Sequence, residues 1–455
     1  GAAFAVRLAF SLWSMRHVPT ALGDEFSYWY YGNQMAHLHG YVGYDFVPQG
    51  NTYGVVSSHV ASSYYPVGWP ALLGVVYWIG LHVPLLDNQP KLTAVLQTVM
   101  STGTVALVYF IARKAFNHRV AIIAAVIIAA FPSLIAEVGT YSLETAFIFF
   151  MLIALAIVVD HDWASGPMSR KRLLWFGVAL GWSATVRPFS LPLLVGIVVA
   201  VWCAGRGWRE VVRSLGWTAI TLMLVLLPWT VRNEVRFHRI IPFSNNLGDT
   251  MCLSRYVGSN GGFAWSDHPG CADPHLPEAI RNTANIKAAV HFVLDHPREE
   301  LRQTPLRFRL MMNNDHALFD EVESNGSQIT FTGAWRTAVH QTADWYFRIV
   351  WILSLAGLGL MFRGWRKDRL LGPRRALIAI PALFLLLIPI ELWGNPRFHV
   401  PVLPFMAMAA AAGISSAVDR WIHRGRTRPG DPVPPVESDD YEGVVPGGAM
   451  KTAVG

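Results

Sequence analysis

The chain has 455 residues, of which 53% are hydrophobic and only 15% are charged, and its mean hydropathy is +0.33. Soluble domains carry about 25% charged residues, so this composition excludes a water-soluble enzyme, a disordered regulator and a disulfide-rich miniprotein, and it predicts a polytopic membrane protein. The net charge of +7 does not indicate a nucleic-acid partner, because most charges lie in short clusters between apolar segments, as the positive-inside rule describes.

Ten segments of the sequence are long and apolar enough to be transmembrane helices, which need about 20 residues. They are 1–18, 92–112, 120–137, 144–161, 172–187, 188–204, 215–232, 345–362, 375–392 and 399–418. Gly1 already lies within the first of them, so we expect native residues before it and no cleavable signal peptide.

The apolar segment 66–83 qualifies by composition as an eleventh span, but the basic clusters argue against it. These clusters lie at 113–119, 170–172, 206–213, 363–375 and 420–428. All five face the cytoplasm only if 66–83 lies along the outer surface instead of crossing the membrane. Both ends of the chain are then cytoplasmic.

This topology divides the chain into four regions. They are an N-terminal transmembrane module (1–232) with a first outer loop (19–91), an outer cap (233–344), C-terminal transmembrane helices (345–418) and a cytoplasmic tail (419–455). The tail is rich in Pro, Gly and acidic residues, and we expect it to be disordered. Amphipathic segments at 277–296 and 297–312 predict a small, mostly helical cap. The predicted fold class is therefore all-α, with about ten transmembrane helices and surface-lying helices in the first outer loop.

The three cysteines are too few for a zinc site or a disulfide framework. Cys252 and Cys271 flank a Gly-rich stretch of the cap, and on the oxidising side of the membrane we predict a disulfide between them. Cys203 lies in an apolar segment and is expected to be a small core residue. The sequence at 325–327 matches a glycosylation sequon, which is a weak signal.

Two adjacent carboxylates, Asp24 and Glu25, follow the first span directly, and an aromatic-rich segment comes after them. Acidic groups at a membrane surface are costly unless they are hydrated or have a function. A structural interpretation is also open: Asp24 suits a helix N-cap and Glu25 suits the first turn, where the helix dipole favours acids.

The order of these features resembles the C-type glycosyltransferases, and most closely the branch of bacterial protein O-mannosyltransferases and lipid A aminoarabinose transferases. The resemblance covers about 1–418, apart from the middle of the cap. The motifs that carry it are Arg7 in the first span, Asp24-Glu25, Tyr64-Tyr65-Pro66-Val67-Gly68-Trp69-Pro70, Ala112-Arg113-Lys114-Ala115-Phe116, Phe131-Pro132-Ser133, Tyr141-Ser142-Leu143-Glu144, Thr185-Val186-Arg187-Pro188, Leu227-Pro228-Trp229-Thr230-Val231-Arg232-Asn233, and Asn395-Pro396-Arg397-Phe398-His399. Each motif is weak alone, but together and in this order they are specific.

The resemblance implies transfer of a sugar from a polyprenyl-phosphate donor to a hydroxyl acceptor at the outer face of the plasma (inner) membrane. A hydroxyl is a poor nucleophile, and a positioned carboxylate can take its proton as the new bond forms. The first acid of the pair is catalytic in that superfamily, so the resemblance assigns the base to Asp24. Glu25 would orient Asp24, bind the acceptor or help to hold a metal. A single displacement opposite the phosphate would invert the anomeric configuration.

The leaving lipid phosphate needs charge stabilisation, which arginines at the membrane surface can supply. The candidate phosphate ligands, all at predicted outer ends of helices, are Arg397, His399, Arg187, Arg232 and Lys91. Arg397 is the first choice because it lies in the short loop that closes the bundle. Pairing with nearby acids, or anchoring at the interface, explains these basic residues equally well.

Other polar residues have two interpretations each. Glu144 begins a span, where it can cap the helix or support an acceptor or a metal. Tyr28, Tyr64 and Tyr65 fit sugar or lipid contacts, or an interfacial aromatic belt. Arg7, deep in the first span, is expected to be structural. The histidines show no ligand spacing, and because some superfamily members use a divalent cation, such a cofactor stays open.

The expected partners are a polyprenyl-phosphate-linked sugar, membrane lipids and a glycan, lipid or protein acceptor. A transporter or flippase of lipid-linked substrates is the main alternative, although no internal repeat marks one. A membrane scaffold without activity is a further alternative, and replacement of Asp24 would separate it from an enzyme.

Overall fold

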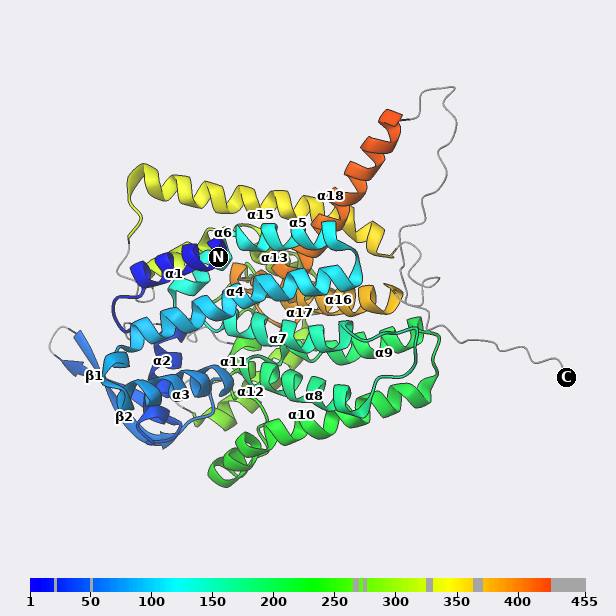
Figure 1. Ribbon diagram of the computed structural model, residues 1–455. Helices are drawn as coiled ribbons and strands as arrows, with labels where there is room; N and C mark the ends of the chain where they lie inside the picture. Colours follow the sequence, from blue (N-terminus) through cyan, green and yellow to red (C-terminus); the bar gives the residue numbers. More distant parts are fainter. Residues whose placement is uncertain are drawn as a thin grey trace. The chain divides into compact units, whose positions relative to one another are not determined.

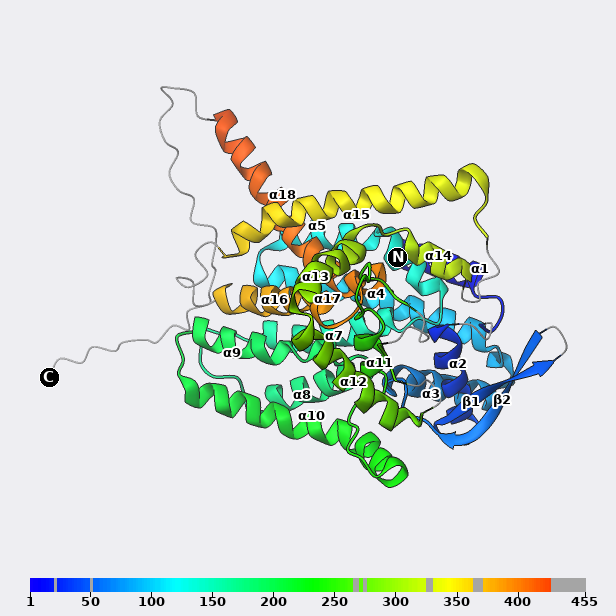
Figure 2. The same cartoon turned by 180° about the vertical axis from the view of Figure 1, so that it is seen from behind.

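We describe a computed structural model of the chain, which gives residues 1–19, 23–49, 52–264, 270–272, 276–324, 330–362 and 371–426. Residues Gly1–Ser415 pack as one unit, and the description below concerns this unit. It is built from helices and one β-hairpin (Figures 1 and 2).

Every segment predicted to span the membrane is helical. The helices are α1 (Ala2–Ser14), α4 (Gln89–Ala115), α5 (His118–Ala129), α6 (Pro132–Ala136), η2 (Glu137–Gly139), α7 (Glu144–Val159), α8 (Arg170–Val186), η3 (Pro188–Ser190), α9 (Leu193–Cys203), α10 (Trp208–Phe237), α15 (Gly333–Phe362), α16 (Leu371–Leu386), α17 (Ile388–Glu391), η4 (Pro396–Val402) and α18 (Leu403–Arg426).

The structure supports fewer spans than the ten predicted. Among the described residues, four helical stretches are long and apolar enough to cross a bilayer: α4, α10, α16 with α17, and η4 with α18. A fifth, α5 with α6 and η2, bends by 57°, because Pro132 lacks the N–H that would continue α5. The helices α1, α7 and α9 have 13, 16 and 11 residues. At 1.5 Å per residue they fall short of a bilayer core of about 30 Å. Ten spans are therefore not confirmed.

The first loop contains α2 (Asp24–Ala36), β1 (Val42–Gln49), β2 (Thr52–Ala61), α3 (Gly68–His82) and η1 (Pro84–Leu86). The strands pair antiparallel, with Val42 opposite Ala61 and Gln49 opposite Thr52. This hairpin corrects the all-α prediction. Its signal was present in the β-branched and aromatic residues on both sides of a Gly-Asn dipeptide. The segment predicted to lie on the outer surface forms α3, which leaves Val75, Trp78 and Ile79 exposed on one face.

The region 233–344 contributes α11 (Leu247–Cys252), α12 (Glu278–Asp295), α13 (Pro297–Met312) and α14 (Ala317–Ser324). The two predicted amphipathic helices are confirmed as α12 and α13. The sequon at 325–327, basic residues 363–370 and the tail beyond 426 lie outside the described residues.

The helix α7 is the centre of the core. It is buried along most of its length and packs between α4 and α8, as both views show (Figures 1 and 2). Basic side chains gather at its C-terminal end and acidic side chains at its N-terminal end. At its C-terminal end Lys114 and Arg172 pair with Asp160, and the guanidinium of Arg374 donates to the carbonyls of Lys114, Val159 and His161. Its N-terminal end meets the acidic residues described next.

Arg7 in α1 is fully buried, and its guanidinium N–H groups have hydrogen-bond partners. Its Nε donates to Ser101 Oγ at 2.8 Å, and its two terminal nitrogens donate to the carbonyls of Ile128 and Ala129 at 2.9 and 2.8 Å. These carbonyls lie at the C-terminal end of α5, where a helix leaves acceptors unsatisfied. The predicted structural role of Arg7 is confirmed.

Candidate functional site

Four elements that are distant in the sequence bring Asp24, Glu144, Arg187 and Arg397 together at the N-terminal end of α7. Arg397 Nη1 donates to Asp24 Oδ2 at 2.9 Å, and its Nε and Nη2 donate to Glu144 at 2.5 and 3.2 Å. Arg187 Nη2 lies 2.7 Å from Glu144 Oε1. We call these four residues the Arg397 cluster. It unites the predicted base with two of the predicted phosphate ligands.

Local structure fixes each member of the cluster. Glu144 is the first residue of α7, where the helix dipole favours a carboxylate. Arg187 is the C-cap of α8, and Pro188 after it ends that helix. Arg397 lies in the first turn of η4, and its backbone N–H donates to the Asn395 side chain at 2.7 Å. These ends of α7, α8 and η4 are buried, so the guanidinium groups have little freedom to move.

Asp24 differs from its partners in exposure. Its side chain is 39% exposed, whereas that of Glu144 is fully buried and that of Arg397 is 10% exposed. It is the first residue of α2 and caps nothing with its side chain. Its Oδ1 accepts a hydrogen bond from the Tyr65 hydroxyl at 2.6 Å. The N-cap interpretation of Asp24 is therefore wrong, and both carboxylate oxygens are oriented by donors in other elements.

Glu25, the second acid of the pair, points into the protein. It is 1% exposed, and neither of its carboxylate oxygens has a hydrogen-bond partner among the described residues. Burial raises the pKa of Glu25 to about 8. Glu25 therefore carries a proton at neutral pH, and its carboxyl group is inaccessible, unlike that of Asp24.

The predicted aromatic residues divide into two groups. Burial and the charge of Asp24 raise the pKa of Tyr28 and of Tyr65 well above its ordinary value, so both hydroxyls stay protonated. The Tyr28 and Tyr65 rings meet edge to face at 5.2 Å. Tyr64 turns away and donates to Asp249 Oδ2 at 2.8 Å. Tyr65 thus orients Asp24, while Tyr64 contacts the cap.

Two carboxylates near the cluster had no assigned role. Ser142 Oγ donates to Glu137 Oε2 at 2.8 Å and also contacts Glu144. Glu321, on α14, interacts electrostatically with Arg397, and burial raises its pKa to about 8. Asp320 and Glu323 beside it pair with Arg336 instead. In the sequence these three acids of α14 look equivalent, so nothing distinguished Glu321.

The structure does not bring three predicted residues to the cluster. The ring nitrogens of His399 lie 2.6 Å from the Met311 carbonyl and 2.9 Å from Asp315, and the residue is fully buried, which contradicts a phosphate contact. Arg232 donates to the carbonyls of Tyr41 and Ser62 at 2.5 and 2.6 Å. Lys91 is exposed at the start of α4, and among the described residues its side chain has no recorded partner.

Glu144 does not fit its predicted role in acceptor or metal support, because Arg397 and Arg187 occupy its buried oxygens. Within the described part of the chain, no three His, Cys, Asp or Glu side chains converge as ligands of a metal ion.

Residues 88–241 match the family model of dolichyl-phosphate-mannose-protein mannosyltransferases. The resemblance to the C-type glycosyltransferases is confirmed. No curated protein sequence matches the chain significantly.

Solved structures show the same fold. The chain is similar to the Archaeoglobus fulgidus oligosaccharyltransferase in complex with zinc and sulfate (TM-score 0.52, 16% identity, covering 93% of this chain and 49% of that one) and in its apo form (TM-score 0.51, 15% identity, 93% and 51%). It thus spans about half the length of that enzyme. A weaker match is ArnT from Cupriavidus metallidurans bound to undecaprenyl phosphate (TM-score 0.42, 13% identity, 95% and 80%).

Proposed function

We propose that this chain is a membrane glycosyltransferase that moves a sugar from a polyprenyl-phosphate donor to a hydroxyl acceptor at the extracytoplasmic face of the plasma membrane. The observation that carries the proposal is the Arg397 cluster, in which an accessible carboxylate lies 2.9 Å from a guanidinium nitrogen. The description of the matching family, which names a lipid-phosphate-linked mannose, supports this class of donor.

The Asp24 carboxylate has the properties of a general base. Tyr65 and Arg397 each hold one of its oxygens, so its free lone pairs have a fixed direction. In the proposed step Asp24 takes the proton of the acceptor hydroxyl as the acceptor oxygen bonds to the anomeric carbon. The bond from that carbon to the phosphate oxygen breaks, and the electron pair leaves with the phosphate. Attack opposite the phosphate inverts the anomeric configuration.

Arg397 and Arg187 are the proposed phosphate ligands. A guanidinium has five N–H groups, and the recorded bonds of Arg397 use three of them. Arg187 Nη1 is buried and lacks a hydrogen-bond partner among the described residues. A lipid phosphate would satisfy these donors and stabilise the charge that develops on the leaving group.

The test uses the purified chain in lipid nanodiscs with a panel of polyprenyl-phosphate sugars and a cell-envelope extract as acceptor. Release of polyprenyl phosphate is measured. We expect Asp24→Asn to lower kcat by about 100-fold or more with little change in the KM for the donor, because only proton transfer is lost. Asp87→Asn is the matched control, since Asp87 is an exposed acid of the same loop.

Two results would contradict the proposal. Turnover by Asp24→Asn at the parental rate would remove Asp24 as the base. No release from any donor by the parental protein, together with passage of a labelled lipid-linked sugar across a vesicle membrane, would favour the transporter or flippase alternative.

A further inference from the structure

The short helix α11 contacts the segment that orients the proposed base. Asp249 on this helix accepts from the Tyr64 hydroxyl at 2.8 Å and from Asn285 Nδ2 at 2.7 Å. The Tyr64 ring meets the Tyr65 ring edge to face, with centroids 5.0 Å apart. Tyr65 in turn donates to Asp24. A chain of contacts therefore runs from α11 to the base.

The segment that follows α11 contacts the loop that leads to Arg397. Arg255 is 3% exposed, and its guanidinium donates to the carbonyls of Ile390 and Glu391, both at 2.8 Å. These are the last residues of α17, where helical carbonyls lack partners in their own helix. Six residues further on the chain reaches Arg397. A further hydrogen bond, from the Gly394 N–H to the Gly261 carbonyl at 2.8 Å, holds this loop between Glu391 and Arg397.

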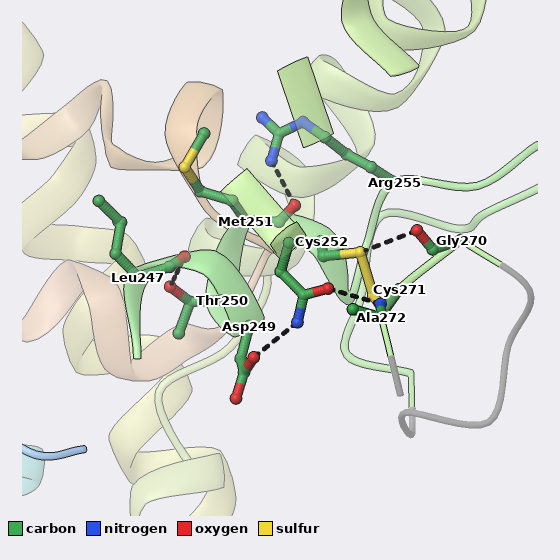
Figure 3. Close-up of a disulfide and its surroundings, with 10 residues drawn as sticks. Leu247, Asp249, Thr250, Met251, Cys252, Arg255, Gly270, Cys271 and Ala272 are labelled. Atoms are coloured by element: carbon green, nitrogen blue, oxygen red, sulfur yellow. Dashed lines mark hydrogen bonds between the residues drawn. A yellow bond between two sulfur atoms is a disulfide. The ribbon is translucent and has the colours of Figure 1, made fainter. Parts of the chain in front are cut away.

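A disulfide joins the two sets of contacts. Cys252, the last residue of α11, is bonded to Cys271, with Cα atoms 5.8 Å apart, so the predicted pairing is present (Figure 3). The backbone N–H of Ala272 donates to Asn285 Oδ1 at 2.6 Å, and this asparagine also holds Asp249. In Figure 3 Asp249 and Arg255 lie on opposite sides of the disulfide-bonded turn.

We propose that α11 and its disulfide form a positioning element that sets the distance between Asp24 and Arg397, with Asp249 and Arg255 as its positioning residues. The proposal rests on the proposed function. A helix of six residues is not stable in isolation, so α11 needs the disulfide and these side-chain bonds to keep its place. Without them, the segments that carry the base and the phosphate ligand would be held less firmly, and their distance would depend mainly on the direct pairing of Asp24 with Arg397.

Hydrogen exchange tests the proposal without turnover. Peptides covering 23–28 and 392–399 are compared in the parental protein and in Cys252→Ser/Cys271→Ser. We expect faster exchange in both segments. Exchange at 110–116, the C-terminal end of α4, should stay unchanged because these residues do not contact α11. Unchanged exchange in 23–28 or in 392–399 would overturn the proposal. If the double variant does not fold, the folded parental protein is reduced and alkylated, and the same peptides are compared.

Kinetics separate positioning from a role in cap stability. We expect Tyr64→Phe, which removes one hydroxyl, to lower kcat about tenfold while the donor KM stays within about twofold, because a small misplacement of reacting groups affects mainly the chemical step. Asp249→Asn keeps an acceptor for that hydroxyl and should retain most of the activity that Asp249→Ala loses. Tyr109→Phe, whose hydroxyl contacts His118 at the other end of α4, is the control.

The two proposals fail in distinguishable ways. A parental protein that releases no lipid phosphate contradicts the proposed function, but the exchange experiment still tests the positioning element. Parental activity with an unchanged kcat in both Tyr64→Phe and Asp249→Ala contradicts the positioning element alone.

Discussion

Neighbours decide what each arginine of this protein does. Arg7 lies inside a predicted span, Arg232 at the end of one and Arg397 in the short loop between two, and all three are partly or fully buried. Arg7 donates to backbone carbonyls at the C-terminal end of α5, and Arg232 donates to carbonyls of the first loop. Arg397 binds the carboxylates of Asp24 and Glu144. Of the three, only the last arrangement places a cation beside an accessible carboxylate. The residue type and its position in the chain predicted a polar partner in each case, but not which partner.

Glu25 predicts a pH dependence of stability. The pKa of Glu25 is raised to about 8 in the folded protein, whereas a carboxyl in the unfolded chain has a pKa of about 4.3. Between these values the folded state holds more protons, so the free energy of unfolding falls as the pH rises from about 5 to 8. We expect Glu25→Gln to flatten part of this decline, measured as the melting temperature in detergent.

The exposed Glu234, exchanged in Glu234→Gln, is the control for that measurement, and its variant should follow the parental curve. Glu321 has a similarly raised pKa, so some decline should persist in Glu25→Gln. An unchanged slope between pH 5 and 8 in Glu25→Gln would show that Glu25 ionises normally.

Close approaches between helix ends place the site residues. Gly68 begins α3, and a Cβ atom at this position would lie 2.4 Å from Thr185 Oγ1 and 2.7 Å from the Thr185 carbonyl carbon. Thr185 comes two residues before Arg187, at the end of α8. The absence of a side chain at Gly68 therefore lets α3 support the turn that presents Arg187.

We expect Gly68→Ala to destabilise the protein by about 1–3 kcal/mol, because the backbone of α8 must shift to admit the methyl group. The same shift should raise the donor KM through Arg187. Thermal unfolding and donor titration measure the two effects. Gly216→Ala on α10, where nothing lies within 4 Å of the added atom, should leave both unchanged. Parental stability and KM in Gly68→Ala would refute the supporting role of this contact.

Two groups of charged residues in the packed unit lie at opposite ends of α7. Carboxylates and arginines of the Arg397 cluster lie where α7 begins, and the basic residues around Asp160 lie where it ends, about 24 Å away for 16 residues. The two ends make different kinds of contact. The basic end binds helix C-terminal carbonyls through Arg374, whereas the acidic end holds the accessible Asp24.

This division predicts that stability and catalysis can be changed separately. Arg374→Met leaves three carbonyls without their donor, and each unsatisfied group costs about 1–3 kcal/mol when it stays dry. We expect a melting temperature several degrees lower, with the donor KM unchanged at a temperature where the variant is folded. A changed KM with unchanged stability would contradict the separation of the two ends.

The sequence alone predicted the helical segments, the two amphipathic helices of the cap, the cysteine pair and the resemblance to the C-type glycosyltransferases. Hydropathy, amphipathic period and motif order are properties of neighbouring residues, so they can be read along the chain. Their limits are physical too. A helix of 13 or 16 residues and a longer one both produce an apolar segment, so hydropathy alone does not distinguish them, and the ten predicted spans are not confirmed. The hairpin was missed because its strands lie in a loop that hydropathy does not resolve.

The partners of the polar residues were decided by the packing of distant segments. Asp24 and Arg397 are 373 residues apart in the chain and 2.9 Å apart in space, and His399, two residues from Arg397, is turned to Met311 and Asp315 instead. A residue's chemistry names the kinds of partner it can accept. The tertiary structure selects one of them, because burial and distance fix which charges meet and which of them stays open to a substrate.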